Sequence, residues 1–435
     1  MSMDVIQERT IVAKVTRRLI PLLFACYIVA YIDRLNIAFA GLQLQKALGV
    51  DAANYNRILG IGKGIFFIGY LLFEIPSNLI LQRVGARLWI ARIMILWGLI
   101  ASCMMFISSD TSFYILRFLL GVGEAGFFPG IILYLTYWYP AKERAQTMAL
   151  FATAAVMAGI IGSPIAGAMM TLNGFGGLGG WQWLFLLEGI PAVLLGFVVF
   201  FWLPDKPAQA RWLSAEEKAG LEAKLSEEAA LAKLQNPHRL IDAFTSRRVW
   251  LLCLLYFLLN VGGYGYELWL PTIIKGFSGQ SDFVVGLINA IPYVAAILIM
   301  VPVGRHSDRT GERRWHVALG AMTSAVGFAL SAWFQNPYLA MAALTLAFVG
   351  LKSMLGPFWA MGTTILSGTA AAGGIALINS VGNIGGFVGP TIVGTVVDKT
   401  GSPSIALLVL GGALLAMGLI AMTIRAGTGK ETTPL

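Results

Sequence analysis

Charge is scarce in this chain of 435 residues, because Asp, Glu, Lys and Arg together make up only 12% of it. A soluble globular domain carries about 25% of such residues. Hydrophobic residues reach 57% instead, and stretches of about 20 apolar residues recur along the chain, each long enough to cross a hydrocarbon core of about 30 Å. This composition excludes a set of soluble domains and predicts an integral membrane protein.

Cysteine and histidine are also rare, with three residues of each. The cysteines lie within apolar runs and the histidines lie in or beside predicted loops: Cys26, Cys103 and Cys253; His238, His306 and His316. Neither set has the spacing of a disulfide framework or of a metal site. The sequence also lacks a nucleophile–base pair and a nucleotide-binding motif. We therefore expect neither an enzyme nor a cofactor, and ATP-driven transport finds no support.

The apolar stretches are continuous and rich in glycine. Strands of a membrane barrel alternate apolar and polar residues over about ten positions, so these stretches do not fit a barrel. Helices satisfy their own backbone hydrogen bonds inside the bilayer. The expected fold class is an all-α integral membrane protein with about twelve transmembrane helices, at approximately 19–44, 56–82, 88–108, 113–138, 146–172, 182–203, 248–275, 283–303, 316–335, 338–366, 372–397 and 403–425.

One long polar segment separates the sixth predicted helix from the seventh. It begins at Pro204 and contains SAEEKAGLEAKLSEEAALAKL, in which Ser214 and Glu217 form a capping-box pattern and the remaining charges have helical spacing. We interpret it as a solvated cytoplasmic linker, with a partner-binding helix as the alternative. The predicted division is an N-terminal six-helix bundle at 1–203, a linker at 204–247 and a C-terminal six-helix bundle at 248–435.

The basic residues predict the orientation in the membrane. The formal net charge of +9 would suit nucleic acid, but the Lys and Arg residues gather at loops on one side, together with the linker and both termini. The residues on this side are Arg83, Arg87, Lys142, Arg144, Arg305, Arg309, Arg313 and Arg314. The opposite side has only four basic residues near helix ends, Lys46, Arg57, Lys275 and Lys399. We expect the basic side to be cytoplasmic, with both termini there, in a multi-pass protein of the bacterial inner membrane that binds no nucleic acid.

The two halves of the chain contain a repeat. NLILQRVGAR begins at Asn78 after the second predicted helix, and GRHSDRTGER begins at Gly304 after the eighth. Aligned, they share Arg83 with Arg309, Gly85 with Gly311, and Arg87 with Arg313. Six helices, a linker and six further helices are the pattern of a duplicated transporter. A membrane enzyme or a receptor seldom shows such a repeat.

The loop GRHSDRTGERR resembles the cytoplasmic motif of the major facilitator superfamily, which has Gly, then Asp four residues later, then Arg-x-Gly-Arg-Arg. Glu312 stands where the first of the last two arginines is expected, and the first copy has Asn78 for Gly and Gln82 for Asp. The resemblance implies that this motif controls conformation, through Arg83, Gly85, Arg87, Gly304, Asp308, Arg309, Gly311 and Arg313.

Five further segments resemble the anion:cation symporter family within that superfamily: AYIDRLNIAFAGL (30–42), GIFFIGYLLFEIPSNLIL (64–81), RFLLGVGEAGFFPGIILYLTYWYP (117–140), GWQWLFLLEGIPAVLLG (180–196) and LSGTAAAGGIALINSVGNIGGFVGP (366–390). Carriers of tartrate and of 4-hydroxyphenylacetate are the most similar, and sugar-acid carriers such as the galactonate transporter are more distant. The resemblance implies two six-helix bundles related by a pseudo-two-fold axis.

We single out seven charged residues within the predicted helices, because a charge at the bilayer centre costs roughly 2.5–3.5 kcal/mol on insertion scales. They are Asp33, Arg34, Lys63, Arg117, Glu124, Glu267 and Lys352. Buried ion pairs that hold the halves together would explain single residues, whereas function explains the whole set better. Arg117 and Glu124 are two helical turns apart and share a face, with Gly121 between them. The planar fork of Arg117 suits a carboxylate.

The family resemblance assigns roles to four residues. The positions of Asp33 and Glu124 serve proton coupling in related symporters, and those of Arg34 and Tyr70 serve substrate binding. Asp33 and Arg34 are adjacent, so on a helix they point about 100° apart and need not pair with each other.

Three polar or aromatic residues of the C-terminal half complete the predicted substrate site. Trp359, Asn379 and Asn383 are similar to groups that sugar-acid carriers use, with interhelical packing as the alternative for Trp359. Galactonate-type carriers have a glutamine where this chain has Ala155, which argues against a long polyhydroxy acid.

Lys63, Glu267 and Lys352 are not part of the family pattern, and by helix direction all three lie in the outer half of the membrane. Two extra cations favour a substrate with more than one negative charge, such as a dicarboxylate. A Lys–Glu–Lys network that gates the outer mouth is the alternative, in which Glu267 bridges both lysines.

Together these observations predict a monomeric symporter that imports protons with a tartrate-like hydroxy-dicarboxylate or a related carboxylate. Aromatic-acid and sugar-acid symport are alternatives. A drug/proton antiporter is a rival, but its cationic or lipophilic substrates would be repelled by Arg34, Arg117, Lys63 and Lys352. A sensor that binds an anion without transporting it is a rival from another class.

Overall fold

Nearly all of the described structure is helical. The computed structural model describes residues 5–234, 245–365 and 369–424, so part of the predicted linker lies outside the described residues. The helices are α1 (Val5–Ala40), α2 (Leu44–Leu48), α3 (Ala52–Val84), α4 (Ala86–Cys103), α5 (Asp110–Glu124), α6 (Phe127–Thr136), α7 (Ala141–Met170), α8 (Gly180–Trp202), α9 (Ala215–Leu234), α11 (Arg247–Glu267), α12 (Leu270–Ser278), α13 (Asp282–Thr310), α14 (Arg314–Trp333), α15 (Pro337–Ser353), α16 (Leu355–Ile365), α17 (Thr369–Thr400) and α18 (Pro403–Thr423). Short 3₁₀ turns follow at Met104–Phe106, Phe175–Gly177 and Pro207–Gln209.

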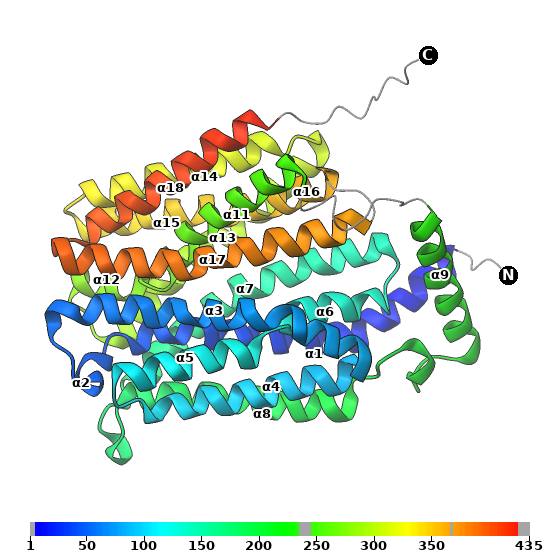
Figure 1. Ribbon diagram of the computed structural model, residues 1–435, viewed down its shortest axis with the longest axis horizontal. Coiled ribbons are helices and arrows are strands. Elements are labelled where there is room, and N and C mark those ends of the chain that lie inside the picture. Colours follow the sequence, from blue (N-terminus) through cyan, green and yellow to red (C-terminus); the bar gives the residue numbers. More distant parts are fainter. Residues whose placement is uncertain (1–4, 235–244, 366–368, 425–435) are drawn as a thin grey trace. The chain divides into compact units, whose positions relative to one another are not determined.

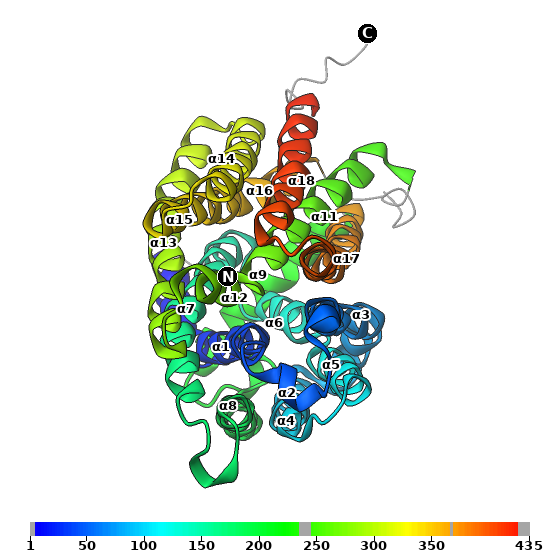
Figure 2. The ribbon, with the colours of Figure 1, turned by 90° about the vertical axis from the view of Figure 1, so that its left-hand side faces the viewer.

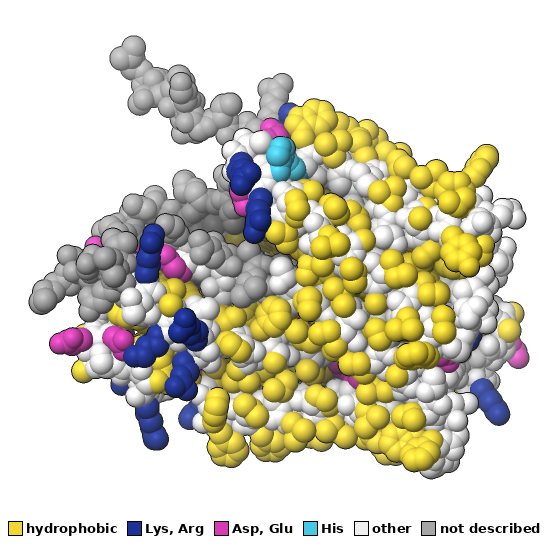
Figure 3. Space-filling view, turned by 180° about the vertical axis from the view of Figure 1, so that it is seen from behind, with side chains coloured by type: hydrophobic (Ala, Val, Ile, Leu, Met, Phe, Trp, Pro, Cys, Tyr) yellow, Lys and Arg dark blue, Asp and Glu magenta, His cyan; other side chains and the backbone are white. Residues whose placement is uncertain are grey.

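Twelve segments of the described residues are long and apolar enough to cross a membrane, which confirms the predicted number. Each overlaps one of the predicted extents. Large apolar side chains remain exposed along these helices, including Leu194, Leu298 and Leu419. Hydrophobic side chains predominate on the face shown in Figure 3, while Lys and Arg side chains gather mainly toward its left edge. Such a surface suits contact with lipid.

The structure separates into two compact units. Unit 1 comprises Met1–Gln235 and Leu268–Ala290, and unit 2 comprises Asn236–Glu267 and Ile291–Leu435. In unit 1, α4 packs along α8, α3 along α5, and α1 along both α7 and α8 (Figures 1 and 2). The linker helix α9 runs across the others at one end of α1 (Figure 1). In unit 2, α11 packs along α17, and α14 along α15 and α18.

Three helices that the sequence predicts as continuous are broken, and each break lies at or one residue after a charged side chain. The predicted helix 113–138 stops at Glu124, and Gly126 takes a positive φ of 85° before α6 begins. The predicted helix 248–275 stops at Glu267, and α12 starts at Leu270 with a proline in its first turn. The predicted helix 338–366 divides after Ser353, next to Lys352. Discontinuous helices are common at the binding sites of transporters.

The basic segments are more helical than the sequence suggests. Helix α13 continues to Thr310, past its predicted end at residue 303, so Gly304 through Arg309 are helical and not in a loop. Helix α7 begins at Ala141, which places Lys142 and Arg144 in its first turn. A polar helix end that projects beyond the lipid can stay helical, and a hydropathy window does not detect it.

The capping box predicted at the start of the linker helix is confirmed. The Ser214 N–H donates to Glu217 Oε2 at 2.8 Å and the Glu217 N–H donates to Ser214 Oγ at 3.1 Å, which is the capping box. The repeated glycines, Gly85 and Gly311, have φ values of 101° and 69° at equivalent turns of the two halves. This positive φ explains why both copies keep glycine there.

Candidate functional site

Unit 1 contains a cluster of charged and aromatic side chains around Arg34. Its guanidinium group forms an ion pair with Glu124, the last residue of α5. Three rings from α1 and α3 surround the same group, with Phe66, Tyr70 and Tyr31 centroids at 5.4, 5.5 and 5.9 Å from Cζ. The side chain of Arg34 is 13% exposed and that of Glu124 is 1% exposed. A carboxylate that approached Arg34 would therefore compete with Glu124, unless Glu124 were protonated.

Asp33 has different partners from its neighbour Arg34. Asn36 Nδ2, one turn further along α1, donates to Asp33 Oδ1 at 2.9 Å, and Trp97 Nε1 from α4 donates to Asp33 Oδ2 at 2.6 Å. The Asp33 side chain is fully buried. This arrangement agrees with the expectation that the two adjacent charges point to different sides of the helix.

Arg117 and Lys63 place two further cations beside this cluster. Arg117 Nε donates to the carbonyl oxygen of Gly62 at 3.1 Å, and its Nη2 donates to that of Lys63 at 3.2 Å. Its Cζ lies 5.1 Å from the Phe66 ring that also contacts Arg34. The Lys63 Nζ lies 3.9 Å from the centroid of Trp269.

Both cations are fully buried, and each keeps a donor nitrogen without an acceptor among the described residues, namely Arg117 Nη1 and Lys63 Nζ. A buried cation without an anionic partner is costly. The aromatic faces of Phe66 and Trp269 offset part of that cost. Each of these two donors could bind an acceptor of an anion that the described residues do not supply.

Unit 2 holds the remaining predicted residues. Glu267 at the end of α11 forms an ion pair with Lys352 near the end of α15. Trp359 on α16 packs at 4.9 Å between ring centroids against Tyr256 of α11. Asn379 and Asn383 lie one turn apart on α17, and Asn383 is 8% exposed. The predicted pairing of Glu267 with Lys352 is therefore present, while Lys63 is found over Trp269 in unit 1.

The structure thus brings Asp33, Arg34, Lys63, Tyr70, Arg117 and Glu124 into one cluster of unit 1. Sequence reasoning missed three members of its surroundings: Asn36, Trp97 and Glu188. Glu188 lies in the middle of the apolar helix α8 and is 5% exposed. A search for every charge inside the predicted helices would have found it, because it interrupts the apolar run GWQWLFLLEGIPAVLLG.

The two copies of the repeated basic motif contact different carboxylates. In the first copy the Arg87 N–H donates to Asp205 Oδ1 at 2.7 Å, and Gly85 packs against the same side chain. In the second copy Arg313 Nη1 lies 2.6 Å from Asp308 Oδ1. Asp205 follows α8, so this chain supplies from elsewhere the carboxylate that Gln82 does not provide.

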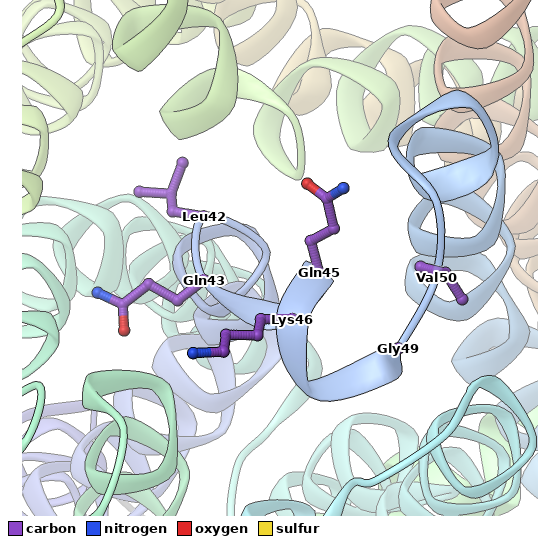
Figure 4. Close-up of a pocket in the computed structure, with 6 residues that line it drawn as sticks. All are labelled: Leu42, Gln43, Gln45, Lys46, Gly49 and Val50. Carbon is purple, nitrogen blue, oxygen red and sulfur yellow. The ribbon is translucent and has the colours of Figure 1, made fainter.

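A separate pocket of about 380 Å³ lies at the turn after α1 (Figure 4). It is lined by Leu42, Gln43, Gln45, Lys46, Gly49 and Val50. Gln43 Nε2 donates to Asp282 Oδ2 at 2.8 Å, and Lys275 Nζ donates to Asp282 Oδ1 at 2.9 Å. None of the lining residues belongs to the predicted site, so this pocket is not the site predicted from the sequence.

Comparison with known proteins gives a consistent picture of the family. The family model described as Major Facilitator Superfamily matches residues 23–390. A protein of Agrobacterium vitis that carries the provisional name of tartrate transporter is 48% identical over 417 residues, covering 96% of this chain and 95% of its own length. A quinolone resistance transporter of Acinetobacter baumannii is 42% identical over 413 residues, covering 95% of this chain and 94% of its own length.

The fold is similar to that of a solved transporter. A partially occluded inward-open structure of the xylose transporter XylE from E. coli has a TM-score of 0.71 at 15% identity, covering 95% of this chain and 98% of that one. At this identity the likeness concerns the fold alone.

Proposed function

This chain belongs to the major facilitator superfamily, and from that premise we propose that it imports a small organic anion together with protons by alternating access. The substrate class we propose is a hydroxy-dicarboxylate similar to tartrate. The name of the Agrobacterium vitis relative supports this class. We expect a monomer in the bacterial inner membrane, with both termini cytoplasmic.

The observation that carries the proposal is that two buried basic side chains, Lys63 and Arg117, each keep a donor nitrogen without an acceptor among the described residues. Together with Arg34 they give unit 1 three basic groups on aromatic rings, of which Arg34 and Arg117 share Phe66 and Lys63 lies over Trp269. A dianion would offset two of these charges, whereas a cationic drug would add to the repulsion. Arginine forks also bind carboxylates with two parallel hydrogen bonds.

The roles follow from this arrangement. Asp33 and Glu124 would exchange the coupling protons, and Arg34, Arg117 and Tyr70 would hold the anion. When Glu124 is protonated it no longer holds Arg34, so the guanidinium group is released toward the substrate. Trp359, Asn379 and Asn383 would contact the carbon skeleton and hydroxyl groups. The pair Glu267–Lys352 would belong either to the substrate site or to an outer gate.

Proton coupling also answers an energetic problem. An anion that enters a negatively charged cell is opposed by about 2.3 kcal/mol per charge for each 100 mV of membrane potential. Symport with at least as many protons as the substrate has charges cancels that opposition.

A drug/proton antiporter is a second candidate, favoured by the similarity to the quinolone resistance transporter. The two candidates differ in the direction of flux relative to the proton gradient. A symporter accumulates its substrate on the side toward which protons flow, and an antiporter moves it the opposite way.

Uptake of radiolabelled L-tartrate into proteoliposomes with an inward proton gradient tests the proposal. We expect accumulation in the wild type, and in Asp33→Asn and Glu124→Gln we expect tartrate exchange without accumulation. Arg34→Lys keeps the charge but loses the fork, so it should weaken tartrate binding in calorimetry. A quinolone that is extruded while tartrate is neither bound nor moved would establish the antiporter instead.

A further inference from the structure

A second acidic side chain lies close to Asp33 in unit 1. Glu188 projects from the middle of α8, which packs against α1 and α4. It is 5% exposed, and neither carboxyl oxygen has a hydrogen-bond partner among the described residues. An ionised carboxylate in such a place is very costly, whereas a protonated carboxyl group is neutral and can donate a hydrogen bond.

The group next to Glu188 is the Asn36 amide, and Asp33 lies within electrostatic range of it. Asn36 uses its Nδ2 to donate to Asp33 Oδ1, while its own Oδ1 is buried with no donor among the described residues. A carboxyl group without a partner therefore lies beside an acceptor without a donor. One proton on Glu188 would satisfy both.

We propose that Glu188, Asn36 and Asp33 form a hydrogen-bonded carboxyl–amide–carboxyl chain that stores one proton. In the first arrangement of this chain, a proton on Glu188 is donated to Asn36 Oδ1, while Asn36 Nδ2 donates to ionised Asp33 through the hydrogen bond that the structure contains. In the second arrangement the amide of Asn36 is rotated by a half-turn, so that its oxygen and nitrogen exchange places. Protonated Asp33 then donates to the amide oxygen, and the amide nitrogen donates to ionised Glu188. The two arrangements contain the same number of protons, and in both each carboxyl group is hydrogen-bonded.

The neighbouring charges decide which arrangement is favoured. Trp97 Nε1 donates to Asp33, and Arg117 lies within electrostatic range of it, so both favour ionised Asp33 in the absence of substrate. The remaining groups around the chain are Glu124 from α5 and its partner Arg34. An anion bound at Arg117 and Arg34 would offset their positive charge and favour the proton on Asp33. Binding of the anion and transfer of the stored proton from Glu188 to Asp33 would then favour each other, as linkage requires.

This inference rests on the proposed proton-coupled transport, but part of its test does not need transport. Infrared difference spectra of purified protein between acidic and alkaline pH report the C=O stretch of protonated carboxyl groups. We expect a C=O band of a protonated carboxyl group whose frequency is sensitive to deuterium exchange. Glu188→Gln should remove this band, and Asn36→Leu should split it or shift its frequency. Glu227→Gln, a change on the exposed face of α9, is the matched control and should leave the band unchanged.

In proteoliposomes, Glu188→Gln should still exchange tartrate. The amount of tartrate that it accumulates under an inward proton gradient should fall several-fold, and the dependence of its uptake rate on pH should change. Glutamine can donate to Asn36 Oδ1, so a purely structural role predicts wild-type behaviour. Because a buried substitution can prevent folding, Glu188→Asp is measured as well, and should keep a band at a shifted position.

An unchanged band in Glu188→Gln, or a band that Asn36→Leu leaves unaltered, would overturn the proposed chain. If the wild type showed the infrared band, with the expected changes in Glu188→Gln and Asn36→Leu, but took up no tartrate, the proposed function would be refuted. The carboxyl–amide–carboxyl chain would still be supported.

Discussion

At the scale of single residues, Lys63 is the side chain with the most unusual environment. It is an ammonium group in a fully buried position, it faces an indole ring, and its charge is repelled by Arg117. Such a group is unfavourable for stability but well suited to bind an anion, because it has already lost its hydration shell. Stability and affinity should therefore respond in opposite directions when its charge is removed.

We predict that Lys63→Met raises the thermal stability of the substrate-free protein in detergent and weakens binding of L-tartrate roughly tenfold, or about 1.4 kcal/mol. Methionine keeps most of the apolar length that packs on Trp269 but removes the buried charge. Calorimetry and thermal unfolding measure the two effects. A variant that is destabilised, with unchanged tartrate affinity, would mean that Lys63 has a structural role.

For the ion pair between Glu267 and Lys352 we predict the opposite effect on stability, namely that removal of one charge is destabilising. Removal of one partner of a buried pair costs about 3–5 kcal/mol, whereas replacement of both is often nearly neutral. Glu267→Gln alone should therefore lower the unfolding temperature more than the double change Glu267→Gln with Lys352→Met. Equal losses in the single and double variants would show that the pair contributes little and that other contacts of these side chains dominate.

At the scale of elements, the close contact of α3 with α5 depends on a small residue. A Cβ atom at Gly121 would lie 2.0 Å from the carbonyl oxygen of Phe66, in the backbone of α3. Because both helices carry cluster residues, this contact positions Arg117 and Glu124 against Phe66 and Tyr70. Small residues at such crossings are the usual means of close helix approach in membranes.

We predict that Gly121→Ala destabilises the protein by about 1–3 kcal/mol, as overpacking does. Gly263→Ala in α11 is the matched control, since a Cβ there meets nothing within 4 Å. The control should be neutral or stabilised by up to about 1 kcal/mol, because alanine is favoured over glycine within a helix. Thermal unfolding of both variants measures the difference, and equal behaviour would contradict the proposed crowding.

The helix breaks show what sequence patterns can and cannot predict. Hydropathy is additive over a window, so it locates the twelve spans well. It treats Glu124 and Ala125 as parts of one apolar run and cannot reveal that the helix stops between them. The partners of Asp33 were equally hidden, because Trp97 and Asn36 look like ordinary members of apolar helices until α1 and α4 are packed together. The charged residues themselves were predictable, since each is costly enough to need a function or a partner.

At the scale of the whole molecule, the linker helix is anchored to the first helix by one ion pair. Lys14 Nζ lies 2.9 Å from Glu217 Oε2. This ammonium group, with the Ser214 N–H, lowers the pKa of the Glu217 carboxyl group. A lowered pKa in the folded state gives stability that is present above the unfolded value, about 4.3, and is lost as the pH falls below it.

We predict that Glu217→Gln lowers the unfolding temperature slightly at neutral pH and has no effect near pH 3. Glutamine keeps the capping box, so the change isolates the charge. The expected effect is below about 1 kcal/mol, because the pair is solvent-exposed. Glu216→Gln on the same exposed turn is the control. A difference that persists in acid would assign the effect to packing and not to the ion pair.

The last prediction follows from the unequal distribution of basic residues between the two sides of the membrane. The sequence predicts that Lys and Arg residues concentrate on the side of the membrane that bears the linker, and cytoplasmic loops of inner-membrane proteins carry that excess. Lys46 on α2 and Ala219 on α9 are both exposed, and they are predicted to face opposite sides of the membrane. In a variant with Cys26, Cys103 and Cys253 replaced by serine, a membrane-impermeant maleimide applied to intact cells should label Lys46→Cys. It should label Ala219→Cys only after the cells are permeabilised. The reverse pattern would place the linker outside and overturn the predicted orientation, although the proton gradient would still set the direction of symport.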